Sequence, residues 1–168
     1  MKNTTRRIAI LGLCASVAMI LSYVESLLPP LLSSIPGIKM GLPNIVVVFV
    51  LYRLGARDAI TVSLVRVLAV ALLFGTPVSM AYSAAGAVLS FLGMVLLKKT
   101  DRFSPTGVSI AGAVAHNLGQ VICSAVLMRT TAIVWYFFVL VISGVIGGCI
   151  VGLLAAWIMR RFEKHVKL

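Results

Sequence analysis

Residues 133–159 read IVWYFFVLVISGVIGGCIVGLLAAWIM and contain no Asp, Glu, Lys or Arg. A helix needs about 20 mainly apolar residues to cross the hydrocarbon core of a bilayer. This stretch is long enough, so it predicts a transmembrane helix. Arg160 and Arg161 follow it directly, and such basic flanks are typical of the cytoplasmic side of a span.

Five further apolar stretches precede this one, separated by turn-forming residues such as Pro29-Pro30 and Gly75-Thr76-Pro77. The second is short and would have to begin near Ile35, with Lys39 in its first turns, to cross a bilayer alone. The sequence predicts an all-α fold, an integral membrane bundle of six transmembrane helices in a single domain over residues 1–168. The predicted helices are about 8–28, 41–53, 59–74, 78–97, 107–128 and 133–159.

The composition excludes an ordinary soluble domain. The chain is 61% hydrophobic and 11% charged, with a mean hydropathy of +1.11, whereas soluble domains are roughly half apolar and about a quarter charged. The net charge of +11 does not indicate a nucleic-acid binder, because the basic residues fall between apolar runs and not on one solvated face. The cysteines, Cys14, Cys123 and Cys149, are isolated, which favours packing over a metal site.

The distribution of Lys and Arg predicts the orientation. With the N-terminus in the cytoplasm, 12 of these residues lie on the cytoplasmic side and 2, Lys39 and Arg129, lie outside, while Arg66 lies within a helix. The positive-inside rule therefore places both termini in the cytoplasm. The cytoplasmic set is Lys2, Arg6, Arg7, Arg53, Arg57, Lys98, Lys99, Arg102, Arg160, Arg161, Lys164 and Lys167.

Small residues recur every four positions in the last two predicted helices, and such stripes let helix backbones approach closely in lipid. We therefore expect these two helices to pack tightly. The residues are Gly107, Ala111, Ala115 and Gly119 in one helix and Gly144, Gly148 and Gly152 in the other.

Ionisable residues inside a membrane are costly and need a partner or a purpose. Arg66 lies near the middle of its predicted helix, and Glu25 lies near the outer end of the first. Two interpretations are open. Glu25 and Arg66 form an internal ion pair, or Arg66 faces a cavity and binds an anionic group of a ligand.

A second polar group lies in the fifth predicted helix, in the segment HNLGQ. His116 and Gln120 are four residues apart and share a helix face, with Asn117 beside them. Three adjacent polar side chains at this depth favour ligand contact over packing. Further candidates for the lining are Asn44, Tyr82, Ser83 and Lys39. The net charge of Arg66, Lys39 and Glu25 together is positive, which favours a ligand carrying carboxylate or phosphate.

The sequence contains few residues suited to catalysis. The chain has 4 acidic residues, and it contains no Gly-Lys-Ser/Thr loop to hold a nucleotide and no nucleophile and base at a recognisable spacing. We expect neither an enzyme nor a metal site.

Several segments resemble the Gx transporter family, which is related to the substrate-binding S components of energy-coupling factor (ECF) vitamin transporters. They span residues 21 to 120 and are specific in combination. The segments are LSYVES (21–26), PGIK (36–39), LYRLGARD (51–58), RVLAVALLFGTP (66–77) and GAVAHNLGQ (112–120).

The resemblance implies an S-component-like bundle that binds a small metabolite such as a vitamin, flavin or isoprenoid precursor. It also implies docking through the first helix on an ECF coupling subunit driven by two ATPases. The family typically carries Ala-x-x-x-Ala there, and this chain departs from it; the nearest matches are Gly12 with Ser16 and Cys14 with Ala18. The implied location is a bacterial plasma membrane.

The resemblance leaves two alternatives. Some relatives serve flavin- or quinone-linked electron transfer beside a flavinylated extracytoplasmic protein, in which case a flavin or quinone would be the bound group. Members are also often labelled heptaprenyl diphosphate synthase component I. Trans-prenyl synthases hold magnesium with paired aspartate-rich motifs, but this chain has only two aspartates, Asp58 and Asp101, 43 positions apart. A role in that synthesis would be non-catalytic.

Overall fold

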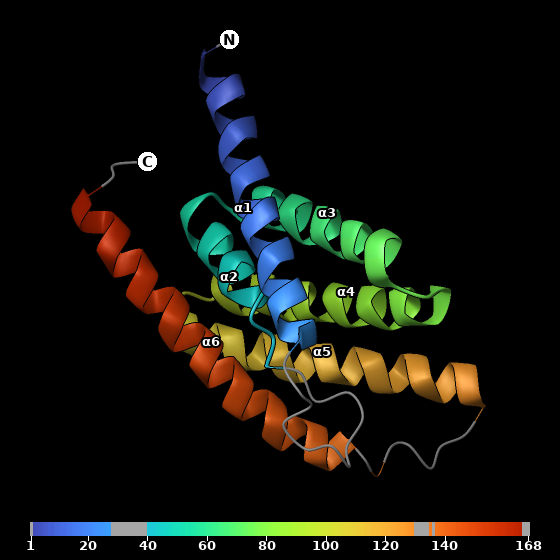
Figure 1. The fold of residues 1–168 in the computed structure, drawn as a ribbon. Helices are drawn as coiled ribbons and strands as arrows, with labels where there is room; N and C mark the ends of the chain where they lie inside the picture. Colours follow the sequence, from blue (N-terminus) through green and yellow to red (C-terminus); the bar gives the residue numbers. More distant parts are fainter. Residues whose placement is uncertain (1, 28–39, 130–134, 136, 166–168) are drawn as a thin grey trace.

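The computed structural model describes residues 2–27, 40–129, 135 and 137–165. Over these residues the fold is all-α, as predicted, with six helices (Figure 1). They are α1 (Lys2–Leu27), α2 (Asn44–Arg53), α3 (Ala56–Phe74), α4 (Pro77–Lys99), α5 (Pro105–Met128) and α6 (Phe137–His165).

Four of these helices, α1, α4, α5 and α6, are long and apolar enough to cross a membrane. The chain is therefore a multi-pass helical membrane protein. Helix α2 has only 10 residues, about 15 Å of helix. Helix α3 has 19 residues but carries three charged side chains, Arg57, Asp58 and Arg66. Whether α2 and α3 also cross the membrane, as the six predicted spans require, remains a prediction.

Some helix ends differ from the predicted boundaries. Helix α1 begins at Lys2 and not near residue 8, because no proline or glycine interrupts the polar residues before the apolar run. Helix α6 continues past Met159 to His165 for the same reason. Helix α2 begins at Asn44, after Pro43. The extension toward Ile35, including Lys39, lies outside the described residues.

Helices α4 and α5 begin at side-chain caps. Thr76 accepts a hydrogen bond from the backbone of Ser79, whose hydroxyl accepts one from the backbone of Thr76 in return. At the start of α5, Ser104 accepts from the backbone of Gly107. These caps satisfy amide groups that a helix start otherwise leaves without partners. Gly55, before α3, has a φ of 107°, a conformation that glycine adopts without strain.

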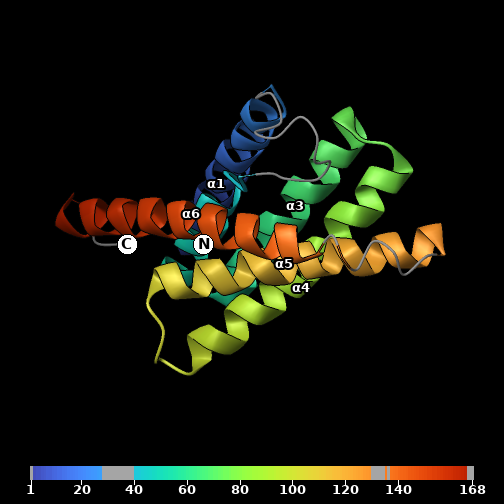
Figure 2. The same cartoon turned by 90° about the horizontal axis from the view of Figure 1, so that it is seen from below.

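The short helix α2 forms the centre of the bundle. It contacts α1, α3, α5 and α6, and Figure 1 shows it between α1 and α6. Val48, Val50 and Leu51 are fully buried. Neighbouring helices surround α2, which explains why residues 45–51 are apolar on every side of the helix. Helix α1 packs on α3, and α4 on α5; the second pair runs side by side in Figure 1 and crosses at an angle in Figure 2.

Glycines bring α5 and α6 into close contact, as predicted. A Cβ atom at Gly148 would lie 2.7 Å from Cα of Ile110, and one at Gly152 would lie 2.6 Å from Cα of Thr106. The face of α5 differs from the prediction, however. Gly119 faces α4, where an added Cβ would lie 2.5 Å from the backbone oxygen of Ala85. Helix α5 therefore uses one small-residue face for α4 and another for α6.

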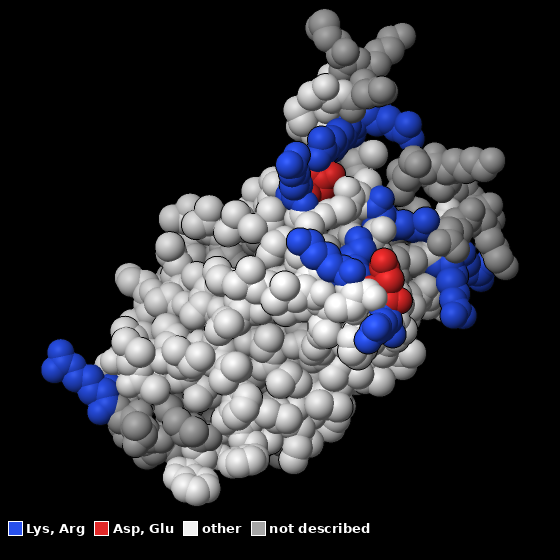
Figure 3. All heavy atoms as spheres, turned by 180° about the vertical axis from the view of Figure 1, so that it is seen from behind, with Lys and Arg blue, Asp and Glu red and all other residues white. Residues whose placement is uncertain are grey.

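Basic residues gather at one end of the molecule, which we call the basic end (Figure 3). The start of α1 is joined to the start of α3 there, because the guanidinium of Arg7 donates to both carboxylate oxygens of Asp58. Asp58 is buried while the Arg7 side chain is 57% exposed. The sequence placed Asp58 beside a loop and did not predict this ion pair.

Two further contacts join α2 to the ends of other helices at the basic end. Arg53 donates to the backbone oxygen of Met159 at 2.8 Å, and Lys98 donates to the backbone oxygen of Leu51 at 2.5 Å. The basic end thus comprises the start of α1, the α2–α3 and α4–α5 connections and the end of α6. Its described Lys and Arg side chains are Arg6, Arg7, Arg53, Arg57, Lys98, Lys99, Arg102, Arg160 and Arg161.

Candidate functional site

A cavity of about 290 Å³ lies among all six helices. It reaches Gly41 and Gly75, in the connections opposite the basic end, and extends inward to Met94 and Val151. Its polar lining comes from α1, α3, α4, α5 and α6 and from the start of α2. The polar residues that line it are Ser22, Glu25, Ser26, Asn44, Arg66, Ser79, Ser83, Ser90, Ser109, His116, Asn117, Gln120 and Ser143.

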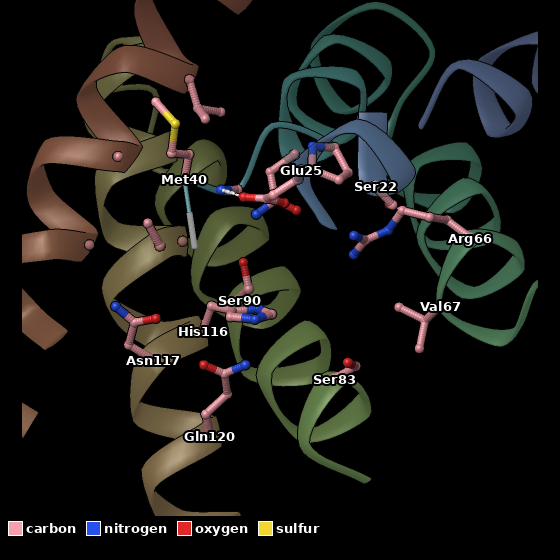
Figure 4. Close-up of a pocket in the computed structure, with 18 of the residues that line it drawn as sticks. Ser22, Glu25, Met40, Arg66, Val67, Ser83, Ser90, His116, Asn117 and Gln120 are labelled. Carbon is pink, nitrogen blue, oxygen red and sulfur yellow. Dashed lines mark hydrogen bonds between the residues drawn. The ribbon is translucent and has the colours of Figure 1, made fainter. Parts of the chain in front are cut away.

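Arg66 projects from α3, and its guanidinium points into the cavity (Figure 4). Val67, the next residue along α3, also lines the cavity and is 8% exposed. The Nε atom of Arg66 is buried and has no hydrogen-bond partner. Within the described part of the chain, Arg66 also forms no ion pair. The guanidinium nitrogens that point into the cavity are therefore the donors that a ligand can meet.

Glu25 lines the cavity from the last turns of α1 and is engaged by the backbone. Its Oε1 atom accepts a hydrogen bond of 2.5 Å from the N–H of Gly41 (Figure 4). Gly41 has a φ of 76°, which glycine adopts readily. The ion pair between Glu25 and Arg66 that the sequence left open is thus not formed among the described residues. The carboxylate instead fixes the segment that leads into α2.

The polar group on α5 contributes all three of its side chains to the lining, namely His116, Asn117 and Gln120. Asn117 donates from Nδ2 to the backbone oxygen of Leu140 at 2.6 Å. This leaves its side-chain oxygen as an acceptor. Figure 4 shows these residues across the cavity from Arg66.

Glycines make room for two of these side chains. A Cβ atom at Gly86 of α4 would lie 2.7 Å from the imidazole of His116, and one at Gly144 of α6 would lie 2.9 Å from Nδ2 of Asn117. Both distances are shorter than van der Waals contact. The glycines therefore position the polar group of α5 as well as bringing helices together.

The structure brings most of the predicted ligand residues together but not all of them. Asn44 and Ser83 line the cavity with Glu25, Arg66 and the α5 group, whereas Tyr82 does not. Adjacent residues of a helix project about 100° apart, so Tyr82 and Ser83 point in different directions. Lys39 lies outside the described residues.

Several serines in the lining were not predicted as site residues. Ser90 and Ser109 are 4% and 3% exposed, and Ser22 and Ser143 also reach the cavity. Ser79 and Ser90 lie four residues before and seven residues after the predicted Ser83 in α4, and this spacing was a usable signal for them. The repeated serines on inward faces are what give this cavity polar walls at several depths.

The residues predicted to dock a partner divide between two faces of α1. Gly12 and Ser16 are exposed, and the hydroxyl of Ser16 donates to the backbone oxygen of Gly12. Ala18 is fully buried and Cys14 is half-buried, packed on the core. Ala18 therefore cannot contribute to a docking surface in this structure, because α2 and α3 cover its side of α1.

These features define a class: a multi-pass helical membrane protein with a small cavity between its helices, lined by apolar and polar side chains. A model of the heptaprenyl diphosphate synthase component I family matches residues 14–158, which is most of the 168-residue chain. The chain belongs to this family. No curated protein and no solved structure matches it.

Proposed function

We propose that this protein is a membrane-embedded binding subunit for the uptake of a small metabolite, similar to the S components of ECF transporters. The observation that carries the proposal is the cavity, where Arg66 lies among other polar side chains and, within the described residues, has no acceptor for its Nε and no ion pair. Charged groups are costly inside a membrane and mark ligand or ion sites there. Binding sites between the helices of a bundle are a common arrangement.

The location of the cavity supports uptake from outside the cell. It reaches the connections opposite the basic end, and the positive-inside rule places the basic end in the cytoplasm. In this orientation both termini are cytoplasmic and the cavity is accessible from the outer face. A coupling subunit and ATPases would then supply the energy for transport, because this chain has no nucleotide-binding loop.

The family name refers to a component of heptaprenyl diphosphate synthase. Magnesium in such an enzyme requires a set of oxygen ligands beside the diphosphate. Asp58 is bound to Arg7 at the basic end, and Asp101 lies in the turn after α4. Neither aspartate lines the cavity. The residues around the cavity therefore favour binding over prenyl transfer.

Ligand retention tests the proposal. The protein is reconstituted in nanodiscs, exposed to a cell extract, washed and examined by native mass spectrometry. We expect one small metabolite to remain bound and to raise the melting temperature when added back. Flavins, quinone precursors and isopentenyl diphosphate belong in the same thermal-shift panel.

A matched pair of variants locates the binding. Ser83→Phe places an aromatic ring into the cavity, whereas Val88→Phe adds the same ring to the same helix at a position that is 55% exposed. We expect the first to abolish retention and the second to preserve it. Retention by both variants, or no retained metabolite in the wild type, would argue against the proposed function.

A further inference from the structure

The two charged side chains that line the cavity differ in their hydrogen-bond partners. Glu25 and Arg66 both line it, and the carboxylate of Glu25 already accepts a short hydrogen bond from the N–H of Gly41. Arg66 has no such partner among the described residues, and its Nε is buried. The carboxylate of Glu25 attracts the guanidinium but lies beyond ion-pair distance, so the charge of Arg66 is only partly balanced, which is costly for a buried group. The cavity is therefore incomplete at Arg66 until an acceptor arrives.

The chemistry of a guanidinium restricts that acceptor. Arginine presents several N–H donors in a planar fork and accepts no hydrogen bonds. The fork matches a carboxylate or a phosphate, with which it forms two parallel charge-assisted bonds. A neutral carbonyl satisfies the donors but leaves the charge uncompensated.

The remainder of the lining limits the size of the ligand. A volume of about 290 Å³ lies at the lower end of the range for small-molecule sites, about 300–1,000 Å³. Across the cavity from Arg66 lie Gln120 and Asn117, whose side-chain oxygen is an acceptor (Figure 4). Val67 and Val70 contribute apolar surface on the α3 side.

From these observations we infer that the ligand is a compact organic anion, whose carboxylate or phosphate binds Arg66 while its far end forms hydrogen bonds with the amides of α5. This inference rests on the proposed function and names the class of its ligand. A diacyl lipid has the same head-group chemistry but exceeds the volume of the cavity.

Probe pairs that share a benzene ring, with one anionic and one neutral member, test the inference. The affinities of the protein for benzoate and benzamide, and for phenyl phosphate and phenol, are measured in phosphatidylcholine nanodiscs. Arg66→Gln removes the charge, Arg66→Lys keeps it without the planar fork, and Arg57→Gln makes the same change at an exposed position of α3. A repeat in phosphatidylglycerol nanodiscs offers an anionic lipid as competitor.

We expect at least one anion to bind about tenfold to a hundredfold more tightly than its neutral partner, the range for charge-assisted hydrogen bonds. Arg66→Gln should abolish this preference, Arg66→Lys should keep part of it, and Arg57→Gln should leave it unchanged. The affinity should be the same in both lipids.

Three results would overturn the inference: equal binding of the neutral probes, an unchanged preference in Arg66→Gln, or displacement of the anions by phosphatidylglycerol. If the wild type binds no probe, the cavity does not accept compact anions. The retention experiment separates this failure from failure of the proposed function. A neutral metabolite that is retained and displaced by Ser83→Phe would leave the binding role intact and contradict only the inferred ligand class.

Discussion

Replacement of Gly148 by alanine should separate α5 from α6. The added Cβ would lie 2.7 Å from Cα of Ile110 and 3.0 Å from Cβ of Ala113. Carbon atoms in contact are normally about 3.5–4.0 Å apart. The neighbouring atom belongs to the backbone of α5, so no side chain can rotate away and the helices must move apart by roughly 1 Å.

Such overpacking costs about 1–3 kcal/mol in well-packed interiors. We therefore expect the free energy of unfolding of Gly148→Ala to lie below that of Gly12→Ala by this amount, because the gain in helix propensity is common to both variants. It can be measured in mixed micelles by raising the mole fraction of sodium dodecyl sulfate and following tryptophan fluorescence. The cavity should also change shape, because Gly148 forms part of its wall.

The control is Gly12→Ala in α1, where an added Cβ would meet no atom within 4 Å. Alanine is a better helix former than glycine by about 1 kcal/mol, so this variant should be as stable as the wild type or slightly more so. If Gly148→Ala unfolds at the same detergent fraction as Gly12→Ala, the described contact between α5 and α6 is wrong.

Three further predictions concern two other contacts and the orientation in the membrane. Glu25→Ala removes the acceptor of the Gly41 N–H and should lower the unfolding free energy by about 1–3 kcal/mol in the same titration, whereas Glu25→Gln, which keeps a side-chain oxygen, should lose less; equal losses would contradict this. Arg7→Gln and Asp58→Asn each break the same ion pair, so the free energy of unfolding of the double variant should be no lower than that of the less stable single variant. If the two decreases in unfolding free energy add, the pair is not formed. Green fluorescent protein fused after the last residue should fluoresce in the cytoplasm, and alkaline phosphatase fused after Arg129 should be active outside; the opposite pattern would reverse the proposed orientation.

The fold was largely predictable because long apolar runs identify membrane helices without tertiary information. The runs now seen in α4 and α5 also carried clear ends, since Thr76 and Ser104 are capping residues. Helix α3 was harder to interpret. Its predicted start at residue 59 left Asp58 outside the helix, because a lone carboxylate does not reveal that Arg7 is its partner 51 residues away.

Only some of the residues that line the cavity could be predicted from the sequence, and the physical reason differs from residue to residue. Arg66 and His116 stand out because polar groups are rare in apolar helices. Ser83 and Tyr82 were indistinguishable, since α4 is apolar on most sides and its rotation about its own axis depends on contacts with α5. The partner of Glu25 could not be predicted at all, because it is a backbone N–H, that of Gly41, and every non-proline residue carries one.

A crystal structure of the protein purified from its native membrane without added ligand would show whether the cavity holds a small molecule at Arg66. We predict density for a compact molecule in hydrogen-bonding contact with the Arg66 guanidinium and extending toward Gln120. A cavity filled by a lipid acyl chain, or closed by direct pairing of Arg66 with Glu25, would contradict this prediction.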